Sequence, residues 1–487
     1  MGKLKSLASD TVIYGASTIL GRMLNWLLMP FYIRTIAQAE YGLVVNIYCI
    51  IAILLVVATL GFETGYFRFV NEENRDKLLD SLLAPIMLVG TAIIAVFGLF
   101  NGFCCDLLEI DAAHGSCLIT AALIILVDAI NAVLFAELRY DRHSVKYSVL
   151  RFLQVLITVL FTLFFILYLR HQTICGIDFG SVNAVQYILI ANLLGSLSSI
   201  FYFVPSFMRR AHGYDFKLLK EVMIYCLPLV GMGFFGVSNQ QIEKLMLLKL
   251  DTTGDALSEL AVYGANYKIG ILMAIFTQSF RLAFEPFFFK ESKESDKRDI
   301  YADVMKYFVY FGLFIYAAVV LFMPLVNIFL TESYYRGNSV IPIVLIGQLI
   351  FGVYYSLSMW YKKIDKTYYG FLMSVVGLSV NALFNYLLIP TYGFMGAATS
   401  ALIGYTVMMV MSLVLGNHYY PINYQFTRML LVSVGVIGLV EITRRLSAEY
   451  MSAYWFVASA ICLIIILVAI LMIEKVSIKN IMRHGKH

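Results

Sequence analysis

Charged residues are scarce in this chain. Asp, Glu, Lys and Arg make up 14% of its 487 residues, whereas soluble domains average about 25%. Hydrophobic residues make up 61%, an excess that a soluble core cannot bury. The composition therefore excludes an ordinary soluble enzyme and predicts an integral membrane protein. The modest net charge of +5 comes from short basic segments, so we expect no nucleic-acid partner.

The sequence also lacks the motifs of nucleotide hydrolysis and covalent catalysis. It contains no phosphate loop of the GxxxxGK type, no GxSxG elbow and no HExxH helix. Its seven cysteines include no CxxC pair and lie mostly in apolar runs, which favours packing over disulfides or metal binding. We therefore expect a chain that is not an enzyme, with no ATP drive of its own, no catalytic residues, no metal and no cofactor.

Long apolar runs are what the sequence has in abundance. A helix needs about 20 mostly apolar residues to cross a bilayer. Only helices and closed barrels satisfy the backbone in lipid, and period-2 alternation is absent, so we predict an all-α integral membrane protein with about fourteen transmembrane helices. The predicted spans are 11–33, 43–66, 78–102, 117–137, 147–169, 184–208, 218–249, 261–283, 304–330, 338–360, 369–389, 393–415, 428–446 and 452–473.

The distribution of basic residues predicts the orientation. With the N-terminus in the cytoplasm, most of the 36 Lys and Arg residues lie in inner segments, and both termini are cytoplasmic. The pair Arg444-Arg445 runs against this trend in the last predicted hairpin. We also expect the seventh helix to be kinked or broken, because it contains the residues Pro228, Gly231, Gly233 and Gly236.

The first twelve predicted spans look like two copies of one six-helix unit. The residues that match at one constant offset are Tyr41-Gly42 with Tyr263-Gly264, Phe62-Glu63 with Phe284-Glu285, and Arg68 with Lys290. We predict one bundle over 1–216, a second in the same orientation over 217–420, and an appended helix pair with a cytoplasmic tail over 421–487. Two parallel bundles of this kind enclose a cleft that opens to alternate sides of a membrane.

Two charged residues lie near the middle of predicted spans, where a charge costs about 2.5–3.5 kcal/mol. Arg22 has Asn25 one turn away, and its planar guanidinium suits a diphosphate. Asp128 has Asn131 one turn away and can carry a coupling proton or ion. The alternative for both charges is structural, either an Arg–Asp pair or a hydrogen bond between helices.

Further charges lie along spans seven and eight. Lys268 and Arg281 belong to span eight, and we group them with Arg22 and Asn25 as ligands of an anionic headgroup. Glu243-Lys244 lies late in span seven, where it either lines the outer part of the cleft or forms an ordinary pair at its rim.

Two acid–base pairs flank the predicted cytoplasmic mouth, one from each bundle. Glu63 with Arg68 belongs to the first bundle, and Glu285 with Lys290 belongs to the second. These pairs either gate the cleft and gather an anionic headgroup, or anchor their helices at the membrane surface.

Several short motifs resemble the oligosaccharide flippases of the Wzx type, over nearly the whole chain. The segments that carry the likeness are Tyr14-Gly15-x-x-x-Ile19-Leu20-x-Arg22, Pro30, Glu40-Tyr41-Gly42, Gly61-Phe62-Glu63, Pro228, Tyr263-Gly264-x-x-Tyr267-Lys268 and Asn381-x-x-x-Asn385-x-x-x-Ile389-Pro390. Where that family often has Asp-Arg late in span seven, this chain has Glu243-Lys244. The charge pattern is kept there, but the geometry of an arginine is lost.

The resemblance implies a member of the MOP (MATE-like) superfamily in the bacterial inner membrane. It implies a flippase that moves an undecaprenyl-diphosphate-linked oligosaccharide to the periplasmic leaflet for surface polysaccharide, by alternating access driven by a proton or sodium gradient. The polyprenyl tail would stay in the membrane lipid, and other polysaccharide-assembly membrane proteins are candidate partners.

Three other functions remain open. A multidrug or cation antiporter of the same fold favours an acidic cleft, whereas this chain has three bases within its spans. A polytopic glycosyltransferase or O-antigen polymerase usually has an outer acidic motif or a large outer loop, and here only Asp106, Glu109 and Asp111 gather on that side. A scaffold without transport of its own is the third alternative.

Overall fold

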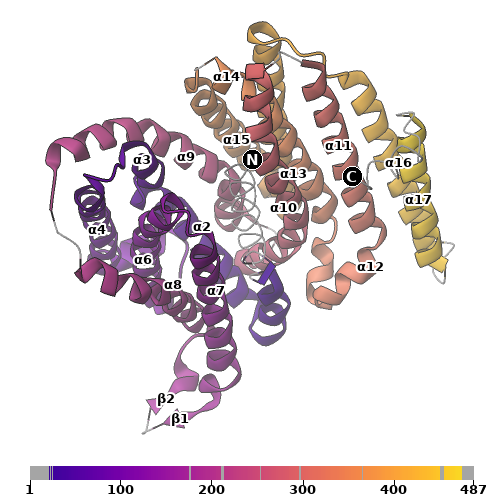
Figure 1. The fold of residues 1–487 in the computed structure, drawn as a ribbon. Helices are drawn as coiled ribbons and strands as arrows, with labels where there is room; N and C mark the ends of the chain where they lie inside the picture. Colours follow the sequence, from indigo (N-terminus) through magenta and orange to yellow (C-terminus); the bar gives the residue numbers. More distant parts are fainter. Residues whose placement is uncertain are drawn as a thin grey trace. The chain divides into compact units, whose positions relative to one another are not determined.

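The computed structural model of the chain describes residues 21–473, except 22, 25, 175–176, 210–212, 253, 295–297, 365 and 450–453. For residues 174, 177, 206, 282–283, 285–294, 299, 447–449 and 473 it describes the backbone alone. Within this described part the chain is almost entirely helical (Figure 1). The predicted all-α class is therefore confirmed.

The chain divides by packing into two compact units. The first unit spans Met1–Ala265 and Ser374–Ala401, and the second spans Asn266–Met373 and Leu402–His487. These boundaries differ from the predicted ones at 216 and 420, because the helix after residue 216 packs on helices of the first unit. The two-bundle repeat stays a prediction.

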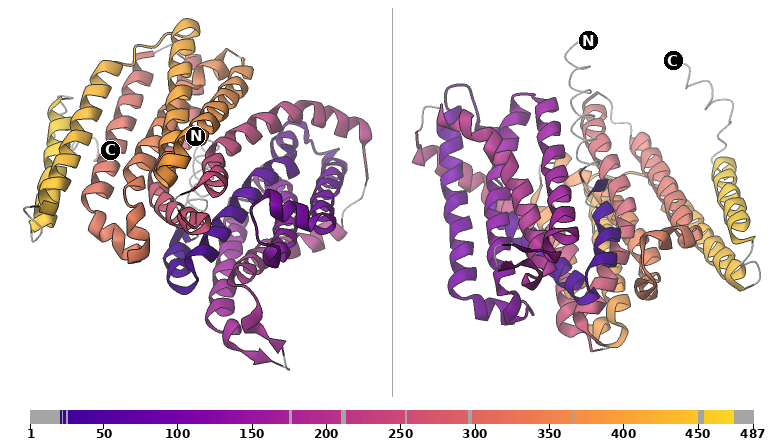
Figure 2. Two further views of the ribbon diagram at one scale, coloured as in Figure 1. Left: turned by 180° about the vertical axis from the view of Figure 1, so that it is seen from behind. Right: turned by 90° about the horizontal axis from the view of Figure 1, so that it is seen from below.

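The first unit is built from helices that pack around α6 (Figure 2). Residues 26–35 are helical and come before the first labelled element. The elements that follow are α2 (Gln38–Ala58), α3 (Phe62–Phe69), α4 (Arg75–Leu99), α5 (Asn101–Leu107), η1 (Ala112–His114), α6 (Gly115–Tyr140), α7 (Ser144–Leu167), η2 (Leu169–His171), β1 (Thr173–Ile174), β2 (Ile177–Asp178), η3 (Phe179–Ser181), α8 (Ala184–Met208) and α9 (Phe216–Leu250).

A small hairpin joins α7 to α8 outside the apolar spans. Its strands β1 and β2 are antiparallel, with Thr173 opposite Asp178. The hydroxyl of Tyr187 donates a hydrogen bond of 2.7 Å to the carbonyl of Phe179 and ties the hairpin to the start of α8. The strands are too short and too polar at their ends to have been predicted from periodicity.

In its described part, the second unit has helices as its only regular secondary structure. It contains α11 (Arg298–Leu321), α12 (Met323–Val326), η4 (Asn327–Phe329), η5 (Glu332–Gly337), α13 (Val340–Leu357), α14 (Met359–Lys363), α16 (Phe426–Glu449) and α17 (Trp455–Ile473). Two long helices, α10 (Ala256–Glu294) and α15 (Tyr368–Tyr419), contribute residues to both units.

Twelve helices of the described chain are long and apolar enough to cross a membrane. One of them, α15, covers the two predicted spans 369–389 and 393–415 and reverses at Gly393, where φ is +51°. Glycine fits this position because a Cβ atom disfavours positive φ. About half of the first predicted span lies outside the described residues. The chain is a multi-pass membrane protein, as predicted.

The seventh span is one continuous helix. Despite Pro228 and three glycines, α9 continues unbroken from Phe216 to Leu250 and curves along its length (Figure 1). Of the two predicted forms, a kinked helix or a broken one, the broken helix is therefore wrong. Proline removes one backbone hydrogen bond, and a membrane helix tolerates that loss where neighbouring groups compensate. At its start, the Asp215 carboxylate accepts a 3.0 Å hydrogen bond from the Leu218 N–H and caps the helix.

Gly42 belongs to the Tyr-Gly motif of the predicted repeat, and it allows two helices of the first unit to approach closely. A Cβ atom at Gly42 would lie 1.9 Å from the carbonyl oxygen of Leu257, which is backbone and cannot move aside. The Tyr-Gly motif of span two is therefore explained by the close approach of α2 and α10. Gly98 in α4, by contrast, has open space where a Cβ would be.

We predict that Gly42→Ala destabilises the protein and that Gly98→Ala does not. The first substitution forces α2 and α10 apart, and overpacking of this kind costs about 1–3 kcal/mol or more. Thermal unfolding of the detergent-purified variants measures both effects. Equal melting temperatures for Gly42→Ala and the Gly98→Ala control would contradict the close contact.

Candidate functional site

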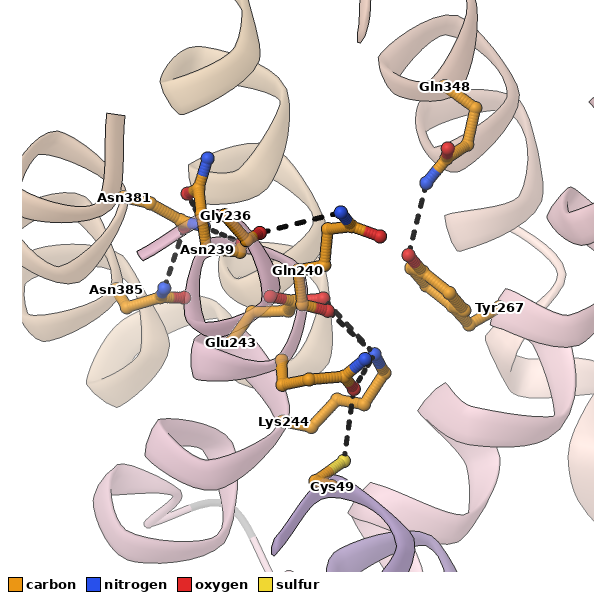
Figure 3. Close-up of polar contacts among 11 residues, drawn as sticks. Cys49, Gly236, Asn239, Gln240, Glu243, Lys244, Tyr267, Gln348, Asn381 and Asn385 are labelled. Atoms are coloured by element: carbon orange, nitrogen blue, oxygen red, sulfur yellow. Dashed lines mark hydrogen bonds and ion pairs between the residues drawn. The ribbon is translucent and has the colours of Figure 1, made fainter. Parts of the chain in front are cut away.

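Late in α9, Glu243 and Lys244 form a buried ion pair (Figure 3). The Lys244 Nζ lies 3.4 Å from Glu243 Oε1 and donates hydrogen bonds of 3.0 Å to the Gln240 carbonyl and to Gln241 Oε1. The exposed fractions of the two side chains are 7% for Lys244 and 0% for Glu243. This burial argues against an ordinary pair at the rim of the unit.

Two further observations describe the surroundings of this pair. The Cys49 thiol of α2 donates a 3.3 Å hydrogen bond to Gln241 Oε1, which links α2 to the ammonium group of Lys244 through one amide. The second oxygen of the carboxylate, Glu243 Oε2, is buried and receives no hydrogen bond from the described residues. That oxygen remains available to a proton or an ion.

A cluster of buried asparagines connects α9 to the first half of α15 (Figure 3). Asn381 Nδ2 donates to the Asn239 carbonyl at 3.0 Å and to its Oδ1 at 3.1 Å, and Asn385 Nδ2 donates to Asn381 Oδ1 at 2.9 Å. All three side chains are buried. Buried amides need such partners, since each unsatisfied group costs about 1–3 kcal/mol. The cluster thus specifies how α15 packs against α9.

Asp128 and Asn131 both lead to Ser196 of α8. Asn131 Nδ2 donates to the Ser196 carbonyl at 2.9 Å, and the Ser196 hydroxyl hydrogen-bonds to Asp128. Gln154 Nε2 of α7 donates to the same hydroxyl oxygen at 3.1 Å, and Arg151 Nη1 donates to Gln154 Oε1 at 3.3 Å. The predicted pair is therefore part of a polar network across α6, α7 and α8.

The network continues to α2. Asn192 Nδ2 donates a 2.9 Å hydrogen bond to the Tyr48 hydroxyl. Tyr48 in turn lies within electrostatic range of the Asp128 carboxyl group. Arg151 is held over the ring of Phe135 at 4.0 Å from the ring centroid. The carboxyl group of Asp128 therefore lies among hydroxyl and amide groups inside one unit, which is an arrangement suited to taking up or releasing a proton.

At the predicted mouth, Glu63 pairs with Arg139 of α6 and not with Arg68. Residues five apart do not share a helix face, so Glu63 and Arg68 point in different directions from α3. The Arg68 guanidinium instead lies 4.2 Å from the ring centroid of Tyr225. The first of the two predicted acid–base pairs is therefore replaced by one between helices.

A second ion cluster lies beside this pair. Arg75 donates from Nη2 to Glu137 Oε1 at 2.8 Å and to Asp141 Oδ2 at 2.5 Å. Together with the Glu63–Arg139 pair, it fastens α3 and α4 to the end of α6. All three contacts join residues more than sixty positions apart, so sequence spacing gives no signal for them.

In the second unit, Lys268 and Arg281 lie on α10 and are half-buried. The Arg281 guanidinium lies over the ring of Tyr355, 4.4 Å from its centroid. Beside Lys268, the Tyr267 hydroxyl accepts a 3.0 Å hydrogen bond from Gln348 Nε2 of α13 (Figure 3). These contacts hold the described part of α10 to α13.

The remaining predicted site residues lie outside what the structure describes. Arg22 and Asn25 fall outside the described residues, and of Glu285 and Lys290 only the helical backbone is described. In the described part of the chain, no group of three His, Cys, Asp or Glu side chains is arranged to hold a metal ion.

Sequence reasoning missed the uncharged members of these networks. Gln154, Ser196, Asn192 and Tyr48 are polar residues within apolar spans, and their position there was the available signal. Intramembrane amides and hydroxyls need partners as charges do. Asn381 and Asn385 were noticed only as part of a family motif, although their spacing of four residues places them on one helix face.

The sequence matches a known protein family. Residues 7–292 match the family model described as polysaccharide biosynthesis protein. No curated protein matches the chain in a sequence search.

Several solved structures share the fold. The lipid II flippase MurJ in an inward closed conformation has a TM-score of 0.73 at 13% identity, over 95% of this chain and 99% of that chain. An inward-facing multidrug resistance transporter of the MATE family and MOP superfamily has a TM-score of 0.62 at 16% identity, over 82% and 94%. A mutant of the MATE transporter VcmN from Vibrio cholerae has 0.57 at 14%, over 85% and 97%. The predicted MOP (MATE-like) fold is confirmed.

We predict that breaking the buried ion pair is more harmful than removing it. Lys244→Met leaves the Glu243 carboxylate buried without its partner, and such a loss costs about 3–5 kcal/mol. The double substitution Glu243→Gln/Lys244→Met leaves no buried charge and should recover part of that loss. Thermal unfolding of the purified variants measures the difference.

Lys249→Met is the matched control, since Lys249 is exposed on the same helix. It should change the melting temperature by no more than about 1 °C, in keeping with the small effect of exposed charges. A melting temperature for Lys244→Met equal to this control would mean that the ion pair contributes nothing to stability.

Proposed function

Because the chain belongs to the polysaccharide biosynthesis protein family, we propose that it is a flippase for an undecaprenyl-diphosphate-linked oligosaccharide. It moves this intermediate from the cytoplasmic to the periplasmic leaflet of a bacterial inner membrane, for the synthesis of O-antigen or capsule. Transport follows an alternating-access cycle driven by a proton or sodium gradient.

The observation that carries this proposal is the family match over 7–292 in a chain with a transporter fold. The printed name of the family concerns polysaccharide biosynthesis, and the apolar composition leaves room for little besides membrane helices. In such a pathway a lipid-linked glycan must cross the bilayer, because sugars and diphosphates cannot enter hydrocarbon unaided. A multi-pass protein without catalytic motifs suits that step.

The headgroup is bound by Arg22, Asn25, Lys268 and Arg281. Arginine offers a planar pair of donors that matches a phosphate, and lysine adds a second positive charge. The contact between Arg281 and Tyr355 supports this role, because it fixes the direction of the guanidinium. Asn25 supplies a neutral donor for a sugar or phosphate oxygen. The polyprenyl tail stays in the lipid throughout.

Asp128 and Asn131 couple transport to the gradient. The hydrogen-bonded series Arg151–Gln154–Ser196 supports this role, because it links Asp128 to the start of α7 on the predicted cytoplasmic side. Loss or gain of a proton at the carboxyl would change which of these donors it needs. The packing of α6 against α7 and α8 would change with it.

The paired charges near the ends of the spans act in opening and closing. Glu63, Arg68, Glu285 and Lys290 belong to the cytoplasmic mouth, where Arg139 is the described partner of Glu63. The pair Glu243 and Lys244 belongs to the outer part of the pathway. Its buried, unbonded Oε2 supports a role as a second ion or proton acceptor. Partners of the flippase include other membrane proteins of polysaccharide assembly.

We predict that Arg22→Ala abolishes complementation of a flippase deletion, whereas Arg34→Ala does not. Arg34 is an exposed arginine at the end of the same predicted span. Arg22→Lys should restore the charge but not the paired donors, and so give partial activity. Surface polysaccharide, compared at equal levels of membrane-inserted protein, is the measurement.

Normal polysaccharide in the Arg22→Ala strain would remove Arg22 from the binding site. Resistance to cationic drugs, with no polysaccharide in any strain, would instead identify a multidrug antiporter.

We predict that Asp128→Asn uncouples transport from the ion gradient, since asparagine cannot lose a proton and carries no charge. The measurement is translocation of the lipid-linked glycan in proteoliposomes with an imposed pH or sodium gradient. Asp106→Asn removes an exposed carboxylate and serves as the control. If Asp128→Asn retains the pH and sodium dependence of the unaltered protein, the coupling role is wrong.

A further inference from the structure

A leucine adopts the left-handed backbone conformation inside the second apolar span. By length and hydropathy Gln38–Phe69 counts as one span, yet α2 ends at Ala58 and a separate helix, α3, begins at Phe62 (Figure 1). Between the two helices Leu60 has φ +51° and Gly61 has φ +65°. Glycine adopts such angles readily, whereas the Cβ atom of a leucine then lies too close to the following carbonyl oxygen. Leu60 is therefore strained.

The position of Leu60 sets it apart from the other non-glycine residues with positive φ in the described chain. Those residues, Glu109, Arg142 and Gln425, lie in loops that join separate helices. Leu60 instead interrupts one apolar run, where a continuous helix would satisfy every backbone group. A strained residue persists only where surrounding contacts hold it, and such residues gather in clamps and switch regions. Here the contacts of α3 provide that hold.

One side of α3 is docked on α6. Glu63 forms the ion pair with Arg139 described above, and the Arg139 guanidinium also lies 5.1 Å from the ring centroid of Phe67. Glu63 and Phe67 are four positions apart, so they lie on one face of the short helix. This face therefore holds a single arginine of α6 by its charge and by its ring.

The other side of α3 is docked on α9. The Arg68 guanidinium lies 4.2 Å from the ring centroid of Tyr225, and the Cys226 thiol donates a 3.5 Å hydrogen bond to the carbonyl of Gly61. A Cβ atom at Gly65 would lie 2.7 Å from Cys226 Sγ, so the backbone of α3 lies directly against this thiol. Cys226 keeps only 1% of its surface exposed. Movement of α3 away from α9 would therefore uncover it.

We propose that α3 is a hinged latch, which pivots at Leu60 and Gly61 between this docked position and an undocked one. In the docked position the contacts with α6 and α9 outweigh the strain at Leu60. In the undocked position Leu60 relaxes to an ordinary backbone conformation, and both sets of contacts are lost. Because α3 carries Glu63, undocking separates the charges at the predicted cytoplasmic mouth. The motion does not depend on the substrate, but its part in transport rests on the proposed function.

Alkylation of the native Cys226 thiol measures undocking in the full-length protein. Protein reconstituted in liposomes is treated with N-ethylmaleimide, and the modification of each cysteine is followed over time by peptide mass spectrometry. Cys117 is equally buried but lies at the opposite end of α6 from Arg139. The rate at Cys226 is therefore expressed relative to the rate at Cys117 in the same sample, which corrects for general loosening of the protein.

The strain at Leu60 predicts opposite effects of two substitutions. Asparagine tolerates the left-handed conformation, so Leu60→Asn should favour docking and slow Cys226 alkylation about fivefold. Valine is β-branched and tolerates that conformation poorly, so Leu60→Val should speed alkylation. Leu54→Asn and Leu54→Val place the same side chains at a half-buried helical position of α2 and should leave the rate unchanged. Equal rates in Leu60→Asn and Leu60→Val would overturn the hinge.

A second comparison shows whether α3 moves as one body. Glu63→Gln breaks a contact with α6, whereas the reporter Cys226 lies on α9, and α3 links the two. The substitution should speed Cys226 alkylation about twofold, in keeping with one partly exposed ion pair. Asp141→Asn breaks the contact of Arg75 between α4 and α6 without touching α3, and it should leave the rate unchanged. If Glu63→Gln reacts like Asp141→Asn, α3 is not a latch.

Locking α3 in place tests its part in transport. A cysteine at position 65 would lie within reach of Cys226, so Gly65→Cys should form a disulfide with it on oxidation by copper phenanthroline. The cross-linked protein should lose glycan translocation in proteoliposomes, and a reductant should restore it. Full translocation by the cross-linked protein would overturn the latch. If the unaltered protein translocates no glycan while the Cys226 rates change as expected, the proposed function fails and the latch stands.

Discussion

Hydrocarbon offers no hydrogen bonds, and this constraint governs the whole molecule. Each backbone donor within a span must find its acceptor in the same helix, so the chain is helical wherever it is apolar. Polar side chains in those spans must likewise find partners in neighbouring helices. The asparagine cluster between α9 and α15, and the Ser196 network across α6, α7 and α8, are the result. These networks select how the helices pack, because apolar surface alone distinguishes poorly between one rotation of a membrane helix and another.

The sequence was sufficient for the helices because length and hydropathy are local properties. Spans such as 147–169 and 338–360 correspond closely to α7 and α13. At Pro228 the sequence left a kinked and a broken helix both open, and the helix is continuous. Whether a missing hydrogen bond breaks a helix depends on its surroundings. The turn at Gly393, by contrast, follows from local sequence. Hardly any loop separates the two predicted spans, so the chain must reverse sharply there, and the positive φ of Gly393 provides that reversal.

The candidate site was less predictable because its contacts join distant parts of the chain. Asp128 stood out as a charge in an apolar run, and its link to Asn131 through one serine became visible only when α6 and α8 lay side by side. Glu63 shows the limit of spacing arguments. Its nearest base along the chain is Arg68, yet the geometry of a short helix turns that base away, and Arg139 becomes the partner. Adjacent residues such as Glu243 and Lys244 were found together, but their burial was not foreseen.

The lysines that lie over tyrosine rings have a consequence for acidic conditions. A carboxylate partner gains a proton as the medium acidifies, and its attraction for an ammonium group then disappears. A neutral ring has no proton to gain in that range, so the hold of Tyr419 on Lys366 and of Tyr420 on Lys363 persists. Acid stress that loosens carboxylate-based contacts, such as that between Arg75 and Asp141, would leave these two lysine–tyrosine contacts in place.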